Sequence, residues 1–358
     1  MKLAIALLLA PALAYADGAS TPGPDGDEFA AQPIPRLALE LQLFTDADWI
    51  HQTGTDFTQF RLDRGEAGAA IGFAKHYGAE LRLESIRSGE AGGELGIDGD
   101  SIVVRIKRAQ VYGDFDAGAV HFHAAIGVTP DPWIATLETD YPLLPLSFTA
   151  SERLLGWPVS DLAALGSVAY GPIRLNVSFG NGEGLDYPER NNGKTTTAVL
   201  EGVPLDLAGN RLRVIVLGKD GSVGPALVRD RRLGAAATFT SHYASAGAEL
   251  VRAYGIGDRG DLVGWVYAGW AEARPIDHVI VAARGSGISY DAGGRYTSVG
   301  GAVAVEPWQQ GPRGDLRVWL AIDRTHASGV AEPLPGAEPG DAITFFLIAS
   351  VTAPFIIP

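Results

Sequence analysis

A transmembrane, antiparallel, up-and-down β-barrel of about sixteen strands is the fold that this all-β sequence predicts. Three observations predict it: about sixteen short segments with alternating apolar and polar residues, connections that alternate between long and short, and an export signal at the N-terminus. Alternation with a period of two gives a strand one apolar and one polar face, as a wall between lipid and water requires. Outer-membrane barrels also have short turns at one end and longer loops at the other.

The N-terminus carries the pattern of an exported chain. Lys2 precedes an apolar run, and Ala14-Tyr15-Ala16 is the small-x-small pattern that signal peptidase cuts. The apolar run is too short to span a bilayer as a helix. The residues after it are rich in proline, glycine and aspartate and lack the apolar content to pack. We therefore expect a signal peptide over 1–16, a flexible periplasmic segment over 17–35 and an outer-membrane β-barrel over 36–358.

Four segments show the alternation most clearly. In each of them aliphatic side chains share one face, while most side chains on the other face are charged or polar. Residues 77–84, for example, place Leu81 and Leu83 on one face, and Arg82 and Glu84 on the other. The four segments are 37–43, 77–84, 173–179 and 315–323.

Twelve weaker segments bring the expected number of strands to sixteen, and this even number places both chain ends in the periplasm. One of them contains Arg105-Ile106-Lys107-Arg108, which breaks the alternation and needs a β-bulge. The twelve segments are 57–73, 102–115, 119–129, 162–170, 195–204, 210–219, 231–244, 246–256, 262–274, 277–289, 294–307 and 342–354.

The last of these segments belongs to the stretch 342–358, which is apolar nearly throughout and resembles a tail-anchor helix. Its Thr344, Val351 and Thr352 favour a strand, and the segment is short for a helical span. We expect it to close the barrel, with its lipid-facing side chains being Phe345, Leu347, Val351 and Phe355.

The connections between these segments alternate in length, which is the second barrel signal. The pattern is less clear at 257–261, which is short for an external loop, and at 307–313, which is long for a periplasmic turn. The expected long loops are 45–56, 89–101, 130–161, 180–194, 220–230 and 326–341. The expected short turns are 74–76, 116–118, 170–172, 205–209, 244–246 and 274–277.

Composition and motifs exclude several classes of function. A formal net charge of −14 argues against nucleic-acid binding, and the absence of cysteine excludes disulfides and thiolate chemistry. No serine-hydrolase, phosphate-loop or HExxH motif occurs, so we expect neither an enzyme nor a cofactor. His121 and His123 lie two apart on one strand face, but two ligands are too few for a defined metal site. We therefore expect no metal site.

A soluble secreted β-sandwich or propeller is the alternative fold, because its strands alternate for the same reason. A sandwich needs large apolar side chains on the faces that pack together. In most of these segments the second face carries Arg, Glu, Asp, Gln or Ser instead. The pattern therefore favours the membrane barrel.

Several short motifs are spread over the chain: Phe60-Arg61-Leu62-Asp63-Arg64, Val104-Arg105-Ile106-Lys107-Arg108-Ala109-Gln110-Val111, Gly127-Val128-Thr129-Pro130, Ser151-Glu152-Arg153, Phe179-Gly180-Asn181-Gly182-Glu183-Gly184, and Ala283-Arg284 before Ser289-Tyr290-Asp291. Together they resemble landmarks of the phosphate-selective porin (porin O/P-like) family of bacterial outer membranes. The resemblance implies a sixteen-stranded barrel, often trimeric, through which small solutes diffuse. It implies no catalysis.

The chemistry of a pore depends on charged groups in the lumen and on whatever narrows it. By the alternation, nine side chains are candidates to line the lumen: Arg82, Arg174, Arg211, Arg213, Arg274, Arg284, Arg317, Glu80 and Glu84. Each of them could also do no more than solvate the wall through ion pairs. We expect four aromatic residues to lie at the membrane interfaces, on either side of the apolar band that faces lipid: Trp49, Trp265, Tyr267 and Trp270.

The connection 130–161 is the longest and mixes aromatic, proline and charged residues, so we expect it to fold into the lumen as a constriction loop. Its candidate site residues are Glu138, Asp140, Glu152 and Arg153, with Arg153 facing the solute path.

The sequence thus predicts a passive outer-membrane porin for small polar or charged solutes. The alternative is a non-conducting structural or adhesive outer-membrane barrel. The expected partners are outer-membrane lipids and lipopolysaccharide, small solutes or ions, and two further copies in a possible homotrimer, with no nucleic acid.

Overall fold

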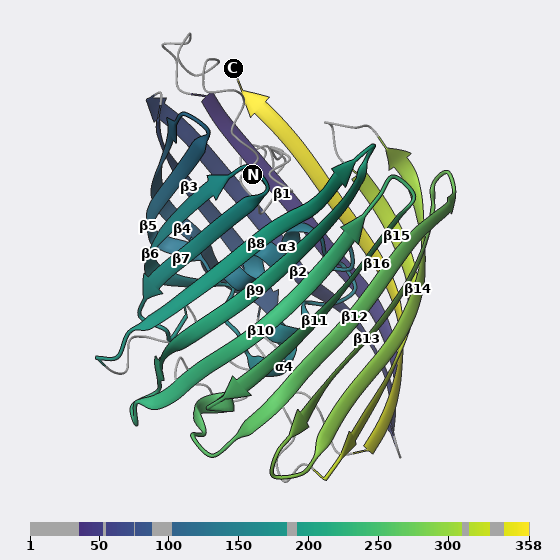
Figure 1. The fold of residues 1–358 in the computed structure, drawn as a ribbon. Coiled ribbons are helices and arrows are strands. Elements are labelled where there is room, and N and C mark those ends of the chain that lie inside the picture. The colour runs from purple at the N-terminus through teal and green to yellow at the C-terminus, as the bar shows by residue number, and fades with distance from the viewer. Residues whose placement is uncertain are drawn as a thin grey trace.

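The computed structural model describes residues 36–52, 55–74, 76–87, 102–184, 192–309, 315–329 and 340–357. In these ranges sixteen strands form one closed barrel, in which each strand pairs with its neighbours in the chain and β16 pairs with β1 (Figure 1). A closed wall has no free strand edge, so its backbone polar groups pair between strands. The predicted all-β fold and strand number are confirmed. The predicted signal peptide and the segment 17–35 lie outside the described residues.

The strands are long, and most of them extend beyond the segments that the alternation predicted. No helix in the described ranges is long and apolar enough to cross a membrane. The strands are β1 (Arg36–Gln52), β2 (Thr55–Ala74), β3 (Tyr77–Arg87), β4 (Ile102–Ala117), β5 (Val120–Pro130), β6 (Ser160–Tyr170), β7 (Ile173–Gly180), β8 (Thr195–Leu207), β9 (Asn210–Val223), β10 (Val228–Thr240), β11 (Ala244–Tyr254), β12 (Val263–Ile276), β13 (Val279–Tyr290), β14 (Arg295–Gln309), β15 (Asp315–Ser328) and β16 (Gly340–Ile357). The helices are α3 (Pro132–Thr139), α4 (Ala150–Leu155) and the 3₁₀ turn η1 (Ile256–Asp258).

The two ends of the barrel differ in their connections. Leu37 at the start of β1 pairs with Ile357 at the end of β16, so the described chain begins and finishes at one end, here called the turn end. Two-residue turns join strands there, for example β8 to β9. In that turn Ala208 and Gly209 both have positive φ, 52° and 78°, as a type I′ hairpin requires. The opposite end, here called the loop end, carries the connection between β5 and β6.

The outward and inward faces of the strands follow the predicted period of two. On β9, Val214 and Val216 are 42% and 51% exposed on the outside, while Arg213 and Ile215 are buried inside. On β16, Phe345, Leu347 and Val351 are exposed as predicted, whereas the side chain of Phe355 lies outside the described part of the structure. Apolar side chains therefore form the outer surface of the wall.

A bulge interrupts the pairing of β3 with β4 where the sequence predicts one. Arg82 pairs with Arg108 and Leu83 with Ile106, so Lys107 is the extra residue of β4. An extra residue lets two consecutive side chains turn toward the same face. Arg105, Lys107 and Arg108 all contact inward carboxylates as a result.

Two predicted loops are wrong. The range 45–56 belongs mostly to β1, which continues to Gln52, and to β2, which starts at Thr55. The range 220–230 belongs mostly to β9 and β10, which are separated by only four residues, 224–227. Both hairpins continue past the clear alternation, and their exposed outward residues include Thr45 on β1 and Asp220 on β9. The predicted strands end too early because the alternation of apolar and polar residues stops before the strand pairing does.

Candidate functional site

Residues 131–159, here called the inner segment, lie inside the barrel rather than above it (Figure 1). The segment leaves β5 at the loop end, forms α3 and α4, and enters β6. Its helices contact β7 and β8, and β11 to β13, on their inner side. The candidate functional site is the space that this segment shares with the inner wall.

Local sequence signals start and stop the two helices of the inner segment. Asp131 caps α3, accepting hydrogen bonds from the backbone N–H groups of Trp133 (2.9 Å) and Ile134 (3.2 Å). Thr149 caps α4 and accepts from the N–H of Glu152 at 3.3 Å. Gly156 ends α4 in the left-handed conformation, with φ 58°. These caps fix where the two short helices begin and where α4 ends.

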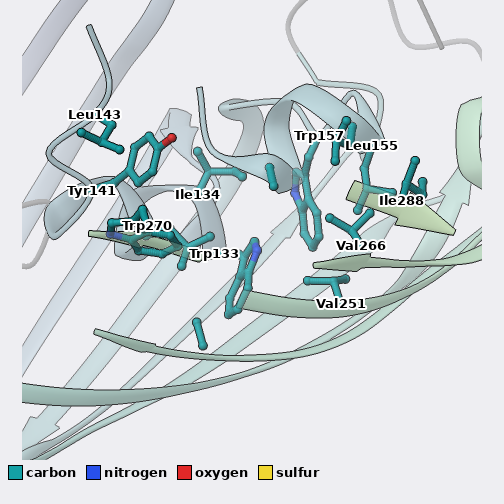
Figure 2. Packing of buried hydrophobic residues seen from close by; sticks show 14 of the residues in the cluster. Trp133, Ile134, Tyr141, Leu143, Leu155, Trp157, Val251, Val266, Trp270 and Ile288 are labelled. Carbon is teal, nitrogen blue, oxygen red and sulfur yellow. The ribbon is translucent and has the colours of Figure 1, made fainter. Parts of the chain in front are cut away.

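One side of the inner segment packs on aliphatic side chains that point inward from β8 to β13. Trp133, Ile134 and Leu137 of α3 are completely buried in this cluster, and Figure 2 shows the first two. Trp157 and Leu155 pack at its other end (Figure 2). The inward wall residues, here called the apolar wall, are Val199, Ile215, Leu217, Val251, Val266, Ile280 and Ile288.

Hydrogen bonds fix the inner segment on the same side. The Glu249 carboxylate of β11 accepts from the N–H of Ala150 (2.9 Å) and from the hydroxyl of Ser151 (2.7 Å) at the start of α4. The Asp140 carboxylate accepts from Arg213 of β9 (2.7 Å) and from the Thr238 hydroxyl of β10 (2.5 Å). Anionic groups at a helix N-terminus and at a guanidinium form strong, charge-assisted hydrogen bonds.

The inner face of β2 to β4 is a dense network of ion pairs, here called the charged wall. Arg64 lies 2.6 Å from Glu84 and 2.7 Å from Glu66, and all three side chains are buried. Lys107 lies 2.7 Å from Glu66. Each buried charge has opposite charges beside it, which offsets part of its desolvation. The members of the charged wall are Arg64, Glu66, Glu80, Arg82, Glu84, Arg105, Lys107 and Arg108.

The inner segment also reaches the charged wall. Glu138 of α3 lies 3.5 Å from Arg64 and 3.7 Å from Lys107. The Arg64 guanidinium lies 5.2 Å from the centre of the Phe148 ring. Burial opposes ionisation of Glu138, but Lys107 and Arg64 outweigh it and hold its pKa below the usual range. The segment therefore bridges the lumen between two chemically different walls.

Glu152 of α4 behaves differently from Glu138. Burial raises the pKa of Glu152 to about 8, opposed by Arg64 and Lys107 and reinforced by the negative charge of Glu138 and Glu84. Its Oε2 atom is buried without a hydrogen-bond partner. The pKa values of two carboxyl groups of one segment are thus shifted in opposite directions, because among the described residues Glu138 alone of the two lies within ion-pair distance of cations.

The other predicted arginines lie apart from the charged wall. Arg284 is 2.5 Å from Asp323, and Arg274 and Arg317 are 2.8 and 2.6 Å from Glu306. Arg174 and Arg211 lie near the turn end, at the starts of β7 and β9. The nine predicted pore-lining residues therefore form separate groups: Glu80, Arg82 and Glu84 in the charged wall, Arg213 with Asp140, and the other five on β7, β9, β12, β13 and β15.

Arg153 extends from α4 toward β13 and β14. Its guanidinium donates to the Ser286 hydroxyl and, at 3.4 Å, to the Tyr296 hydroxyl. It also lies 5.9 Å from the centre of the Tyr296 ring. Arg153 thus attaches α4 to the wall through neutral partners.

Sequence reasoning did not single out several residues that organise this site. Arg64, Glu66 and Glu249 point inward by the same period of two that identified Arg82, so the signal was present. The inward aliphatic residues of the apolar wall were missed because an apolar residue on the inner face does not alternate with the apolar residues of the outer face. Trp270 was expected at the membrane interface, which is wrong: it is buried inside, 5.1 Å from Tyr141 between ring centres.

Metal binding has little support in the described structure. His121 and His123 face inward and contact Asp116 and Asp114 at 2.8 and 2.9 Å. In the described ranges, however, no group of three or more His, Cys, Asp or Glu side chains is placed to hold a metal ion.

Comparisons with known proteins support the architecture. No family model and no curated protein matches the chain. Among solved structures, an anion-selective porin from Comamonas acidovorans matches with a TM-score of 0.62 at 11% identity, over 90% of this chain and 100% of the other. OprB of Pseudomonas putida matches with a TM-score of 0.64 at 9% identity, over 89% and 94% of the two chains. OmpT, an outer membrane protein of Vibrio cholerae, matches with a TM-score of 0.59 at 12% identity, over 89% and 97%. The chain therefore has the barrel fold that these outer-membrane proteins share.

Proposed function

We propose that the protein is a passive outer-membrane channel for small polar or charged solutes, narrowed by the inner segment. One observation carries this proposal: a closed wall, apolar outside, has a network of charges inside and a chain segment that bridges it. A wall of this kind is suited to lipid on one side and hydrated solutes on the other. The N-terminal signal pattern and the fold shared with outer-membrane proteins support the same location.

The inner segment is proposed as the constriction, with Glu138, Asp140, Glu152 and Arg153 in its narrow part. Support comes from its attachment to both sides of the lumen, to Arg64 and Lys107 on one side and to Arg213 and Glu249 on the other. Backbone that lies inside a barrel reduces the free cross-section there, and fixed charges beside it select among solutes.

A phosphate preference is not part of this proposal. Lys107 and Lys219 each lie within 2.8 Å of a carboxylate, Glu66 and Asp230. A lysine with such a partner presents less net positive charge to a passing anion. We also propose that the protein forms homotrimers and contacts lipopolysaccharide. The apolar outer surface supports both proposals.

Planar-bilayer recordings with single-cysteine variants test the proposal. The chain has no cysteine, so one introduced thiol is the only target for a charged methanethiosulfonate reagent. Arg284→Cys places it inside the barrel, and Ala283→Cys places it on the outer face of the same strand. We expect stepwise conductance that the reagent changes in the first variant and leaves unaltered in the second.

Two outcomes would contradict the proposal. Folded protein that gives no conductance steps would support the non-conducting structural or adhesive barrel instead. Equal reagent effects in both variants would show that current does not pass through the lumen.

A further inference from the structure

The inner segment is attached to the two sides of the lumen by different forces. On the apolar wall it has buried aliphatic and aromatic contacts together with several hydrogen bonds. On the charged wall its contacts are the Glu138 ion pairs and the Phe148 ring beneath Arg64. A change of charge near the charged wall therefore alters the attachment that depends on ion pairs.

Glu152 is the group placed to make that change. It projects from α4 toward charges carried by four other elements: Arg64 of β2, Glu84 of β3, Lys107 of β4 and Glu138 of α3. Its Oε2 atom is buried and has no hydrogen-bond partner, in contrast to Glu138, which pairs with Arg64 and Lys107. Ionising such a carboxyl without bringing in water is unfavourable.

We propose that Glu152 is a proton-controlled latch: its neutral form lets α4 stay seated with this carboxyl buried near the charges of the charged wall, and its ionisation displaces α4 until water reaches the carboxylate. The latch would regulate the cross-section of the proposed channel. Only this effect on conductance rests on the proposed function, whereas the movement of α4 does not. The bound species is a proton, and the moving part is the inner segment.

The direction of the pH dependence follows from proton linkage. A released segment exposes Glu152, whose ordinary pKa is near 4.5, whereas burial in the seated segment raises this pKa to about 8. Between these values the seated form holds one proton more than the released form. The seated form is therefore favoured in acid and loses about tenfold in its seating equilibrium for each pH unit between about 4.5 and 8. Because the pKa of Glu138 is lowered, its pairs with Arg64 and Lys107 persist over this range.

Tryptophan fluorescence tests the latch without any need for conductance. Trp133 is 0% exposed and donates its indole N–H to the Ser151 hydroxyl of α4 at 3.0 Å, so displacement of α4 breaks this bond and makes the ring accessible to a neutral quencher such as acrylamide. In the wild-type protein in detergent micelles we expect quenching to increase as pH rises from 5 to 8. In Glu152→Gln the side chain cannot ionise, and we expect quenching to stay low throughout.

Two control variants identify the titrating group. Glu138→Gln keeps Glu152 and should keep the pH response, while Glu152→Leu should remove it as Glu152→Gln does. A wild-type protein with flat quenching, or a Glu152→Gln variant with the wild-type response, would overturn the latch. Loss of the response in Glu138→Gln alone would assign the titration to Glu138 and overturn it as well.

Conductance gives the second readout. We expect wild-type conductance to rise from pH 5 to pH 8 and that of Glu152→Gln to remain at the acid value. Equal pH dependence in both proteins would contradict the latch. If folded protein conducts at no pH, the proposed channel fails, and the quenching titration alone then decides the latch.

Discussion

The charged wall of β2 to β4 and the apolar wall of β8 to β13 are built by the same backbone pattern and differ in chemistry. In both, every second side chain points inward, except at the bulge of β4, where Lys107 and Arg108 both contact inward carboxylates. The inward residues of the first include Arg64 and Glu84, and those of the second include Val251 and Val266. The inner segment covers the apolar wall with Trp133, whereas on the charged wall it places Glu138.

The difference shows that the inner face of a barrel is not uniformly polar. Inward side chains that touch solutes or water must be polar, but those beneath a folded segment can be as apolar as a soluble core. The apolar wall is therefore a hydrophobic core inside a barrel. It seats the inner segment, and the charged wall contacts the other side of that segment through Glu138 and Phe148.

The largest expected effect comes from removing the central side chain of that core. Trp133→Ala deletes a fully buried indole and its hydrogen bond to the Ser151 hydroxyl, so we expect the seating of the inner segment to lose about 3–5 kcal/mol. Limited proteolysis of folded protein should then cut within residues 131–159. Trp265→Ala, which removes a 43% exposed tryptophan from the outer face of β12, should leave the cleavage unaltered. If both variants are cut alike, the segment does not depend on the apolar wall.

A smaller loss is expected on the other side of the comparison. Arg64→Met leaves the buried Glu66 and Glu84 with fewer cations, so we expect the barrel to lose about 3 kcal/mol of stability in urea unfolding from micelles. The matched control is Arg229→Met, because its pair with Asp220 lies on the surface and should not affect unfolding. Equal midpoints for Arg64→Met and wild type would mean that the charged wall does not act as a buried network.

The smallest expected effect concerns one hydrogen bond of the inner segment. Thr238→Val keeps the shape of the side chain and removes its 2.5 Å bond to Asp140, which should weaken local seating by about 1 kcal/mol. Hydrogen exchange of the α3 amides measures this as roughly fivefold faster exchange. Thr297→Val, on the outward face of β14, serves as the control and should leave exchange unchanged. A slower rate in Thr238→Val would contradict the role given to this bond.

Much of the architecture was predictable from the sequence because its cause is local. Each of the sixteen predicted segments lies mainly on one strand, and the bulge among Arg105-Ile106-Lys107-Arg108 lies where the alternation breaks. Strand ends were less predictable, as the hairpins at 45–56 and 220–230 show, because pairing continues where the outward face turns polar. Among the candidate site residues, the alternation placed Arg82, Glu84 and Arg213 on the inner face but did not show their partners.

The sequence by itself determined the strands, their outward faces and the closed barrel, because alternation is a property of neighbouring residues and lipid requires an apolar outer surface. Only the tertiary structure decided that Trp133 lies in a core inside the barrel, that Arg64 pairs with Glu84, and that the pKa values of Glu138 and Glu152 are shifted in opposite directions. The physical reason is that these properties depend on contacts between residues distant in the chain. Burial and opposing charge act through space, and a period of two contains no information about which side chains meet across a lumen.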